Sequence, residues 1–208
     1  MNARQLNALD ALRGLSVETT LKEAMMSEMR PRFHALRDRE KPRAVSAFQL
    51  FQTPAPLARR LVSLLALKPG ETVLEPSAGL GRILDELPEG VEAVAVEVNR
   101  DCAAELFRAD RDCCRVVEAD FLTLTPETLG SFSAVAMNPP FHLRADIRHT
   151  LHALRFLRPG GRLAGICMAG PARERELRPL CSIWETLPRG TFRAEGTDVE
   201  TILFTIQN

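Results

Sequence analysis

The 208-residue sequence contains no tyrosine, one tryptophan, and only three lysines among its 27 basic residues. No apolar run reaches the roughly 18 residues that span a bilayer. The amino terminus also lacks the apolar core of a secretory signal, so we expect a cytoplasmic protein with no membrane partner. Net charge is zero, with 27 acidic residues balancing the basic ones. Neutrality argues against a strong non-specific polyanion binder, although a local basic face remains compatible with it.

Metal and disulfide chemistry also lack support in the sequence. The five cysteines are odd in number and form no CxxC pair, which favours reduced thiols. Three histidines, His142, His149 and His152, lie close together. No cysteine or carboxylate completes a standard ligand set around them, so we expect a solvated or substrate-facing helix and no metal site.

Length and composition indicate one domain of the size of a catalytic domain, which we place at residues 51–208, preceded by a helical extension, residues 1–50. Leucines recur at helical spacing from Leu6 to Leu12, and a capping box at residues 20–23 opens a second predicted helix that Pro31 ends. Residues 30–43 hold six basic and two acidic residues, a net charge of +4. This segment is either a solvated face or an arm that contacts phosphates.

Strands and helices alternate from residue 51 onward, which is typical of a parallel sheet covered on both faces. Thr53-Pro54 begins the first helix of this part, and Pro69-Gly70 ends it. The expected strands are 72–74, 91–96, 115–117, 134–137 and 163–168, and the expected later helices are 82–87, 100–109 and 147–157, the last closed by a Pro-Gly-Gly at 159–161. Segments 190–193 and 199–206 are predicted to form an antiparallel hairpin at the sheet edge.

The first candidate site is a glycine turn after the first expected strand. Gly79-x-Gly81 would let the backbone approach a ligand closely. The third glycine of a dinucleotide fingerprint would fall at Leu84, so that fingerprint is incomplete. Glu75, at the end of the strand, would repel a pyrophosphate and suits a cationic ligand instead.

Acidic residues also follow the next two expected strands. Glu97, with Val98 beside it, could accept both hydroxyl groups of a ribose. Asp120 could accept from an exocyclic amino group, and Phe121 could cover a ring face. Ligands of open α/β sheets bind at the carboxyl ends of the strands, so these positions favour a binding role.

The most specific motif is Asn138-Pro139-Pro140-Phe141, after the fourth expected strand. Two consecutive prolines fix the backbone and supply no N–H donors, so the loop is rich in acceptors. The Asn138 amide and the Pro139 carbonyl can accept the hydrogens of an NH2 group while Phe141 stacks on the planar group that carries it. These features predict a catalytic loop for a planar amine.

Together, these motifs resemble class I S-adenosylmethionine-dependent methyltransferases, in the branch that methylates adenine N6, cytosine N4 or glutamine N5. Phe51-Gln-Thr-Pro54 resembles the additional cofactor motif of that branch, and Ser77 stands where the first glycine of the cofactor loop is usual. The resemblance covers about residues 48–208 and implies a Rossmann-like, seven-stranded, mostly parallel sheet with a reversed last strand. It implies S-adenosylmethionine as cofactor and catalysis by Asn138–Phe141. The implied cofactor residues are Thr53, Glu75, Ser77, Gly79, Gly81, Glu97, Val98, Asp120, Phe121 and Asn138.

Three functions are compatible with this resemblance. The first is methylation of adenine N6 in DNA or RNA, on a single-stranded or flipped-out base. Arginines after the loop would contact phosphates or form a polar helix face: Arg144, Arg148, Arg155 and Arg158. The second is methylation of protein glutamine or a small molecule, although those relatives more often have tyrosine at the Phe141 position. The third is a non-catalytic, cofactor-binding subunit of a methyltransferase complex.

Overall fold

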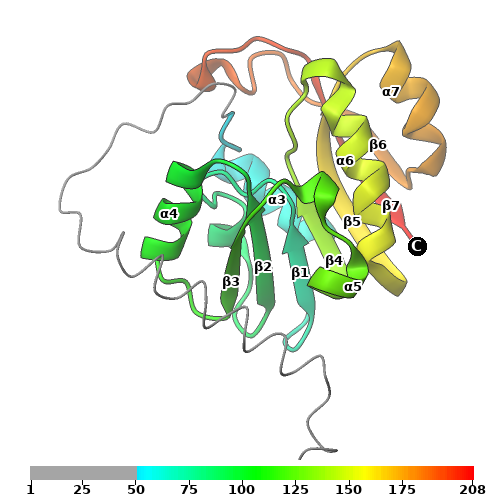
Figure 1. Ribbon diagram of the computed structural model, residues 1–208. Coiled ribbons are helices and arrows are strands. Elements are labelled where there is room, and N and C mark those ends of the chain that lie inside the picture. Colours follow the sequence, from blue (N-terminus) through cyan, green and yellow to red (C-terminus); the bar gives the residue numbers. More distant parts are fainter. Residues whose placement is uncertain (1–50) are drawn as a thin grey trace, which may run out of the picture. The chain divides into compact units, whose positions relative to one another are not determined.

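A computed structural model describes residues 51–208 (Figure 1). The predicted helical extension, residues 1–50, and its basic segment lie outside the described residues, so the domain division stays a prediction. Within the described part of the chain, no helix is long and apolar enough to cross a membrane.

Seven strands form one sheet in the order β3-β2-β1-β4-β5-β7-β6. Strand β7 runs antiparallel to both its neighbours, and the pairs from β3 through β5 are parallel. The predicted Rossmann-like architecture, mostly parallel with an antiparallel terminal hairpin, is therefore confirmed. The strands are β1 Thr72–Glu75, β2 Glu92–Glu97, β3 Cys114–Glu118, β4 Phe132–Met137, β5 Leu157–Met168, β6 Ile183–Thr186 and β7 Thr201–Gln207.

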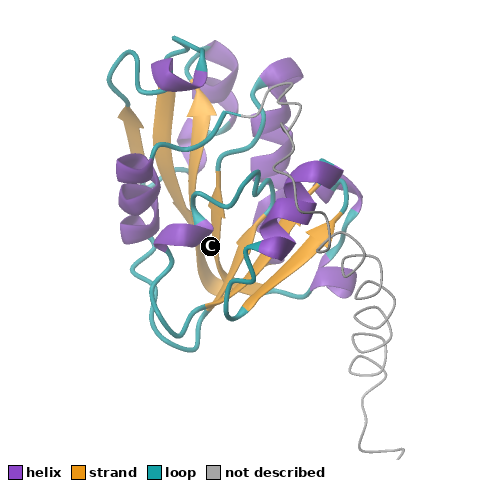
Figure 2. Ribbon diagram, turned by 90° about the vertical axis from the view of Figure 1, so that its left-hand side faces the viewer, coloured by secondary structure: helices purple, strands orange, loops and turns teal. Residues whose placement is uncertain are grey.

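Helices lie on both sides of the sheet (Figure 2). Alternate residues of β1 divide the core, because Val73 packs in the apolar cluster that includes α3 and Leu74 packs in the one that includes α6. The α-helices are α3 Ala55–Leu64, α4 Arg100–Arg108, α5 Pro126–Leu129, α6 Ala145–Ala153 and α7 Pro171–Glu176. Short 3-10 turns complete the chain: η1 Leu84–Glu86, η2 Phe121–Thr123, η3 His142–Arg144, η4 Leu154–Phe156, η5 Arg178–Leu180 and η6 Arg193–Glu195.

Three sequence predictions about these elements were wrong. The helix expected at 82–87 is only the 3-10 turn η1. The first hairpin strand is β6, and residues 190–193 are a turn because Gly190 has a left-handed φ of 80°. Strand β5 already starts at Leu157, so the Pro-Gly-Gly at 159–161 is an irregularity inside a strand, where the register with β4 shifts.

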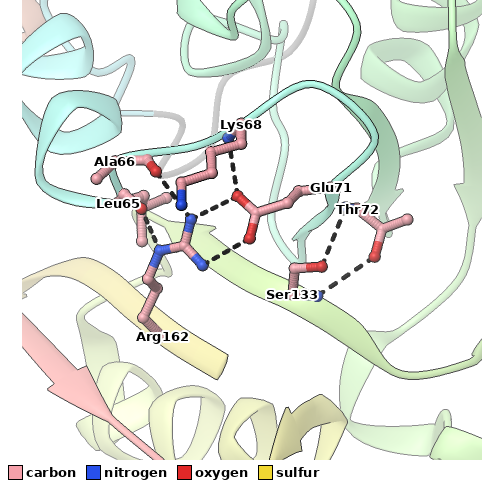
Figure 3. Close-up of polar contacts among 7 residues, drawn as sticks. All are labelled: Leu65, Ala66, Lys68, Glu71, Thr72, Ser133 and Arg162. Carbon is pink, nitrogen blue, oxygen red and sulfur yellow. Dashed lines mark hydrogen bonds and ion pairs between the residues drawn. The ribbon is translucent and has the colours of Figure 1, made fainter. Parts of the chain in front are cut away.

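Arg162 of β5 ties the carboxyl end of α3 to the sheet (Figure 3). Its guanidinium donates to both carboxylate oxygens of Glu71, at 2.9 and 2.6 Å, and to the backbone carbonyls of Leu65 and Ala66. The hydrogen bonds from Arg162 lower the pKa of Glu71 to about 2. Arg162 thus fixes the carboxyl end of α3. Residues 51–54, which precede the amino end of this helix, reach the carboxyl ends of β1 and β4.

Candidate functional site

A cavity of about 410 Å³ lies at the carboxyl ends of β1 to β4. This is the edge where open α/β sheets bind ligands. Twelve of the thirteen residues that the sequence indicated line it: Thr53, Glu75, Ser77, Gly79, Glu97, Val98, Asp120, Phe121, Asn138, Pro139, Pro140 and Phe141.

Gly81, the thirteenth, is not among the lining residues. Its backbone is left-handed, with φ of 84°, and a Cβ there would lie 2.7 Å from Arg111 Nη2. Arg111 in turn donates to Asp85 from Nε and Nη2 at 2.9 and 2.7 Å. Glycine at this position therefore accommodates Arg111 against the turn, which the sequence spacing did not indicate.

Glu97 joins the glycine turn to the end of β2. Its Oε2 accepts from the Gly79 N–H at 2.8 Å, and its Oε1 accepts from the Asn99 N–H at 2.7 Å. Gly79 has a left-handed φ of 56°, which glycine adopts without steric cost. Each carboxylate oxygen can still accept a second hydrogen bond, so both can also accept ribose hydroxyls.

Glu75 supplies a buried acceptor to the cavity. Burial raises the pKa of this carboxyl well above its usual value, although the charge of Arg111 opposes the shift. Within residues 51–208, its Oε2 has no hydrogen-bond partner. An unpaired buried oxygen is costly, and an N–H-bearing or cationic ligand in the cavity would satisfy it.

The side-chain amide of Asn138 is held by residues that precede α3. Its Nδ2 donates to the Phe51 carbonyl at 3.0 Å and to Thr53 Oγ1 at 3.1 Å. A backbone carbonyl can only accept, so the nitrogen must face Phe51 and Oδ1 must face away. No donor to Oδ1 is found in the described chain, which leaves this oxygen as an acceptor for a ligand.

Two aromatic rings of the site are more buried than expected. Phe141 stacks on Phe51 with ring centroids 6.4 Å apart and meets the edge of Phe192. Phe121 packs in the core against His152 and other rings. Both rings line the cavity yet also anchor their loops in the core. The exposed apolar side chain next to Glu97 is instead Val98, which is 69% exposed.

A buried ion pair behind the Asn138–Phe141 loop was not predicted from the sequence. Arg173 of α7 donates to Asp146 from Nε and Nη2 at 2.9 and 2.8 Å, and both side chains are buried. Nη2 also donates to the Phe141 carbonyl at 3.0 Å, and Asp146 accepts from the Met168 N–H at 3.1 Å. The pair joins the loop to α6, β5 and α7. The two residues are 27 apart, and no local pattern distinguishes Arg173 from its charged neighbours.

Arg82 and Cys102 also line the cavity and were not predicted, whereas Arg148, a predicted phosphate contact or polar helix residue, lines it too. His149, which the sequence placed on a solvated or substrate-facing helix, is buried, lines the cavity and lies with Nδ1 3.3 Å from Ser77 Oγ. Burial lowers the pKa of His149 to about 4, so its imidazole is neutral near pH 7. Burial also raises the pKa of Cys102 to about 11, which keeps this thiol protonated. Across residues 51–208, no three His, Cys, Asp or Glu side chains are grouped as metal ligands would be.

No protein-family model matches the chain. One curated relative, ribosomal RNA small subunit methyltransferase A of Thermosynechococcus vestitus, is 35% identical over 90 residues. The match covers 42% of this chain and 34% of that protein. The similarity is therefore confined to a part of both sequences.

Solved structures match more of the chain at lower identity. TrmN from Thermus thermophilus superimposes with a TM-score of 0.63 and 22% identity, over 81% of this chain and 55% of that one. A type I restriction-modification methyltransferase subunit from Streptococcus thermophilus superimposes with a TM-score of 0.64 and 18% identity. The match covers 76% of this chain and 44% of that one. An RNA methyltransferase from Salinibacter ruber, in complex with S-adenosyl-L-homocysteine, superimposes with a TM-score of 0.54 and 16% identity. The match covers 75% of this chain and 92% of that one. The chain has the fold of the class I S-adenosylmethionine-dependent methyltransferases, which confirms the resemblance seen in its motifs.

Proposed function

We propose that this protein is an S-adenosylmethionine-dependent N-methyltransferase that methylates adenine N6 in DNA or RNA. The observation that carries the proposal is the fixed amide of Asn138, whose Oδ1 is left as an acceptor beside the cavity. An amino group donates hydrogen bonds, so this polarity suits an amine as the methyl acceptor. The same polarity would not suit a carboxylate or a phenolate.

The cavity suits the cofactor as well. The unpaired Oε2 of Glu75 is an acceptor in a buried position, as the amino group of the cofactor's methionine part requires. Glu97 has acceptor capacity for ribose hydroxyls, and the exposed Val98 offers an apolar surface to the adenine. When bound, S-adenosylmethionine supplies a methyl group on a positively charged sulfur, which is a good leaving group.

The chain's own contribution is to hold and polarise the nucleophile. An aromatic amine shares its lone pair with the ring, so hydrogen bonds to Asn138 Oδ1 and the Pro139 carbonyl would favour a more tetrahedral nitrogen. Positive charge develops on this nitrogen as the methyl group arrives, next to carbonyl dipoles that are already oriented. The proton becomes acidic only after transfer, so a strong general base is not required. Positioning supplies much of the remaining rate.

The named relatives support a nucleic-acid substrate. One is a ribosomal RNA methyltransferase, and the structural neighbours include an RNA methyltransferase and a restriction-modification methyltransferase subunit. A paired base cannot enter a cavity of this size while stacked in a duplex, so the target base would be single-stranded or flipped out.

The test uses the full chain with isotopically labelled S-adenosylmethionine and, separately, DNA, RNA and protein. Digestion and mass spectrometry then identify the modified monomer, and we expect N6-methyladenine from nucleic acid. Asn138→Ala should bind the cofactor but lower turnover by about 100-fold or more. Label found in glutamine would refute the adenine assignment, and cofactor binding without any transfer would refute catalysis.

A further inference from the structure

The turn after the catalytic loop is strained and projects an apolar side chain. Leu143 and Arg144 have φ angles of 48° and 58°, both left-handed. Such a conformation costs a non-glycine residue roughly 1–2 kcal/mol. Leu143 is also 84% exposed, the largest fraction among the exposed large apolar side chains of the described residues.

Both ends of this turn are anchored in the core. On one side, Phe141 is buried and stacked on Phe51. On the other, Asp146 is fully buried and paired with Arg173, which also holds the Phe141 carbonyl. The buried contacts can therefore offset the strain of the turn. Strain that the surroundings maintain is concentrated at functional sites.

The residues around Leu143 are cationic or line the cavity. His142 and Arg148 both line the cavity, and Arg148 is exposed. The side chain of Arg144 is 60% exposed and lies 3.7 Å from Glu176, a distance at which a surface ion pair contributes little. An apolar tip among cations, beside a cavity for a planar amine, matches a strand whose bases are apolar and whose backbone is anionic.

We propose that Leu143 stacks against the nucleobase next to the one being methylated, while Arg144 and Arg148 contact the flanking phosphates. This inference rests on the proposed function and names the part of the substrate that lies outside the cavity. Removing one base from a stack exposes a face of its neighbour, and proteins that distort nucleic acids insert apolar side chains between unstacked base steps. The partner is thus a polynucleotide, because a mononucleotide has no neighbouring base.

Leu143→Gly is the informative variant, since glycine adopts the left-handed backbone without strain and only the side chain is lost. The substrates are single-stranded RNA and DNA of about ten nucleotides with one adenine, compared with adenosine monophosphate. We expect the ratio of KM for the oligonucleotide to KM for the mononucleotide to rise about tenfold. Leu151→Ala, at an exposed leucine of the following helix α6, is the control and should leave the ratio unchanged.

Binding of a fluorescent oligonucleotide, followed by anisotropy, separates this inference from the proposed function. An affinity that falls on Leu143→Gly supports the inference even if no methyl transfer is seen. Transfer to the oligonucleotide with an unchanged KM ratio would overturn the inference and leave the proposed function standing. An equal rise in KM for the oligonucleotide and for the mononucleotide would overturn the inference too, because Leu143 would then belong to the pocket of the target base.

Discussion

At the scale of single residues, Thr53 makes a contact that its motif alone did not indicate, in addition to lining the cavity. The resemblance assigns it to the cofactor, whereas its hydroxyl accepts a hydrogen bond from Asn138 at 3.1 Å. The hydroxyl is buried and fixes the face that the amide presents. We therefore expect Thr53 to position the Asn138 amide as well as to line the cavity.

Thr53→Val should keep the shape of the side chain and remove this acceptor. One N–H of Asn138 then lacks a partner, and we expect kcat to fall about tenfold while the Kd for S-adenosylmethionine changes less than twofold. Stopped-time assays and calorimetry measure the two quantities. Thr53→Ser should restore kcat, and a raised Kd with unchanged kcat would return Thr53 to the cofactor site.

Glu97 combines two tasks, since it holds the Gly79 N–H and has capacity for ribose hydroxyls. Glu97→Ala should weaken S-adenosylmethionine binding by at least about tenfold, because charge-assisted hydrogen bonds contribute about 1.5–3 kcal/mol each. Calorimetric titration measures this loss. Glu92→Ala, at the exposed start of the same strand, should bind normally. An unchanged affinity in the Glu97 variant would place the ribose elsewhere.

At the scale of elements, the Arg173–Asp146 pair couples α7 to the Asn138–Phe141 loop. Arg173→Met leaves a buried carboxylate without its cation, so we expect a loss of about 3–5 kcal/mol in the free energy of unfolding, measured by urea denaturation. The double variant Arg173→Met with Asp146→Leu should recover part of this loss, because no buried charge remains. A single variant as stable as the original protein would show that the pair is dispensable.

The Glu71–Arg162 pair makes stability depend on pH. The pKa of Glu71 is lowered in the folded state to about 2, below its usual 4.5. The stabilisation is therefore complete above about pH 4.5 and is lost as the pH falls toward 2. Urea midpoints between about pH 6 and pH 3 should decline more steeply for the original protein than for Glu71→Gln. Parallel declines would assign acid sensitivity to other groups.

Elements with strong local signals could be predicted from the sequence, and those that depend on distant partners could not. The helix expected at 100–109 is α4, and the Asn99 side chain before it accepts from the N–H groups of Asp101 and Cys102, as asparagine at this position commonly does. Strand β6 was misplaced because Gly190-Thr-Phe-Arg resembles a strand locally. Phe192 of that segment is instead fully buried in the core beside Phe141.

The same distinction applies to the site. Residues at the carboxyl ends of strands were found because topology alone brings them together, as for Glu75 and Glu97. The roles of Thr53 and Arg173 depend on contacts between segments 85 and 32 residues apart in sequence. Periodicity and motif spacing contain no information on such contacts.

At the scale of the whole molecule, the basic segment of residues 30–43 has the largest net positive charge of any stretch of its length in the sequence. We predict that deleting residues 1–43 preserves S-adenosylmethionine binding and weakens nucleic-acid binding. Loss of up to four phosphate contacts should flatten the slope of log K against log salt by up to about 3. Anisotropy titrations at several salt concentrations measure this slope.

A variant that keeps residues 1–43 but removes several of their positive charges separates the effect of charge from the effect of deleting the segment. Arg30, Arg32, Arg37 and Arg39 replaced by glutamine should reproduce the flattened slope of the deletion. If the deletion binds and methylates nucleic acid as well as the full chain, the segment has another task, and the arginines after Phe141 become the leading phosphate contacts.

The hydrogen bond from Asn138 to the Phe51 carbonyl has a consequence for how the extension would act. Phe51 lines the cavity, and residues 1–50 are joined to it through the chain. A substrate bound by residues 1–50 would thus be tethered to the proposed site, and tethering raises the effective concentration of a ligand there. Even weak binding of substrate by residues 1–50 would raise the turnover rate at low substrate concentration. The gain in rate would vanish at saturating substrate concentration.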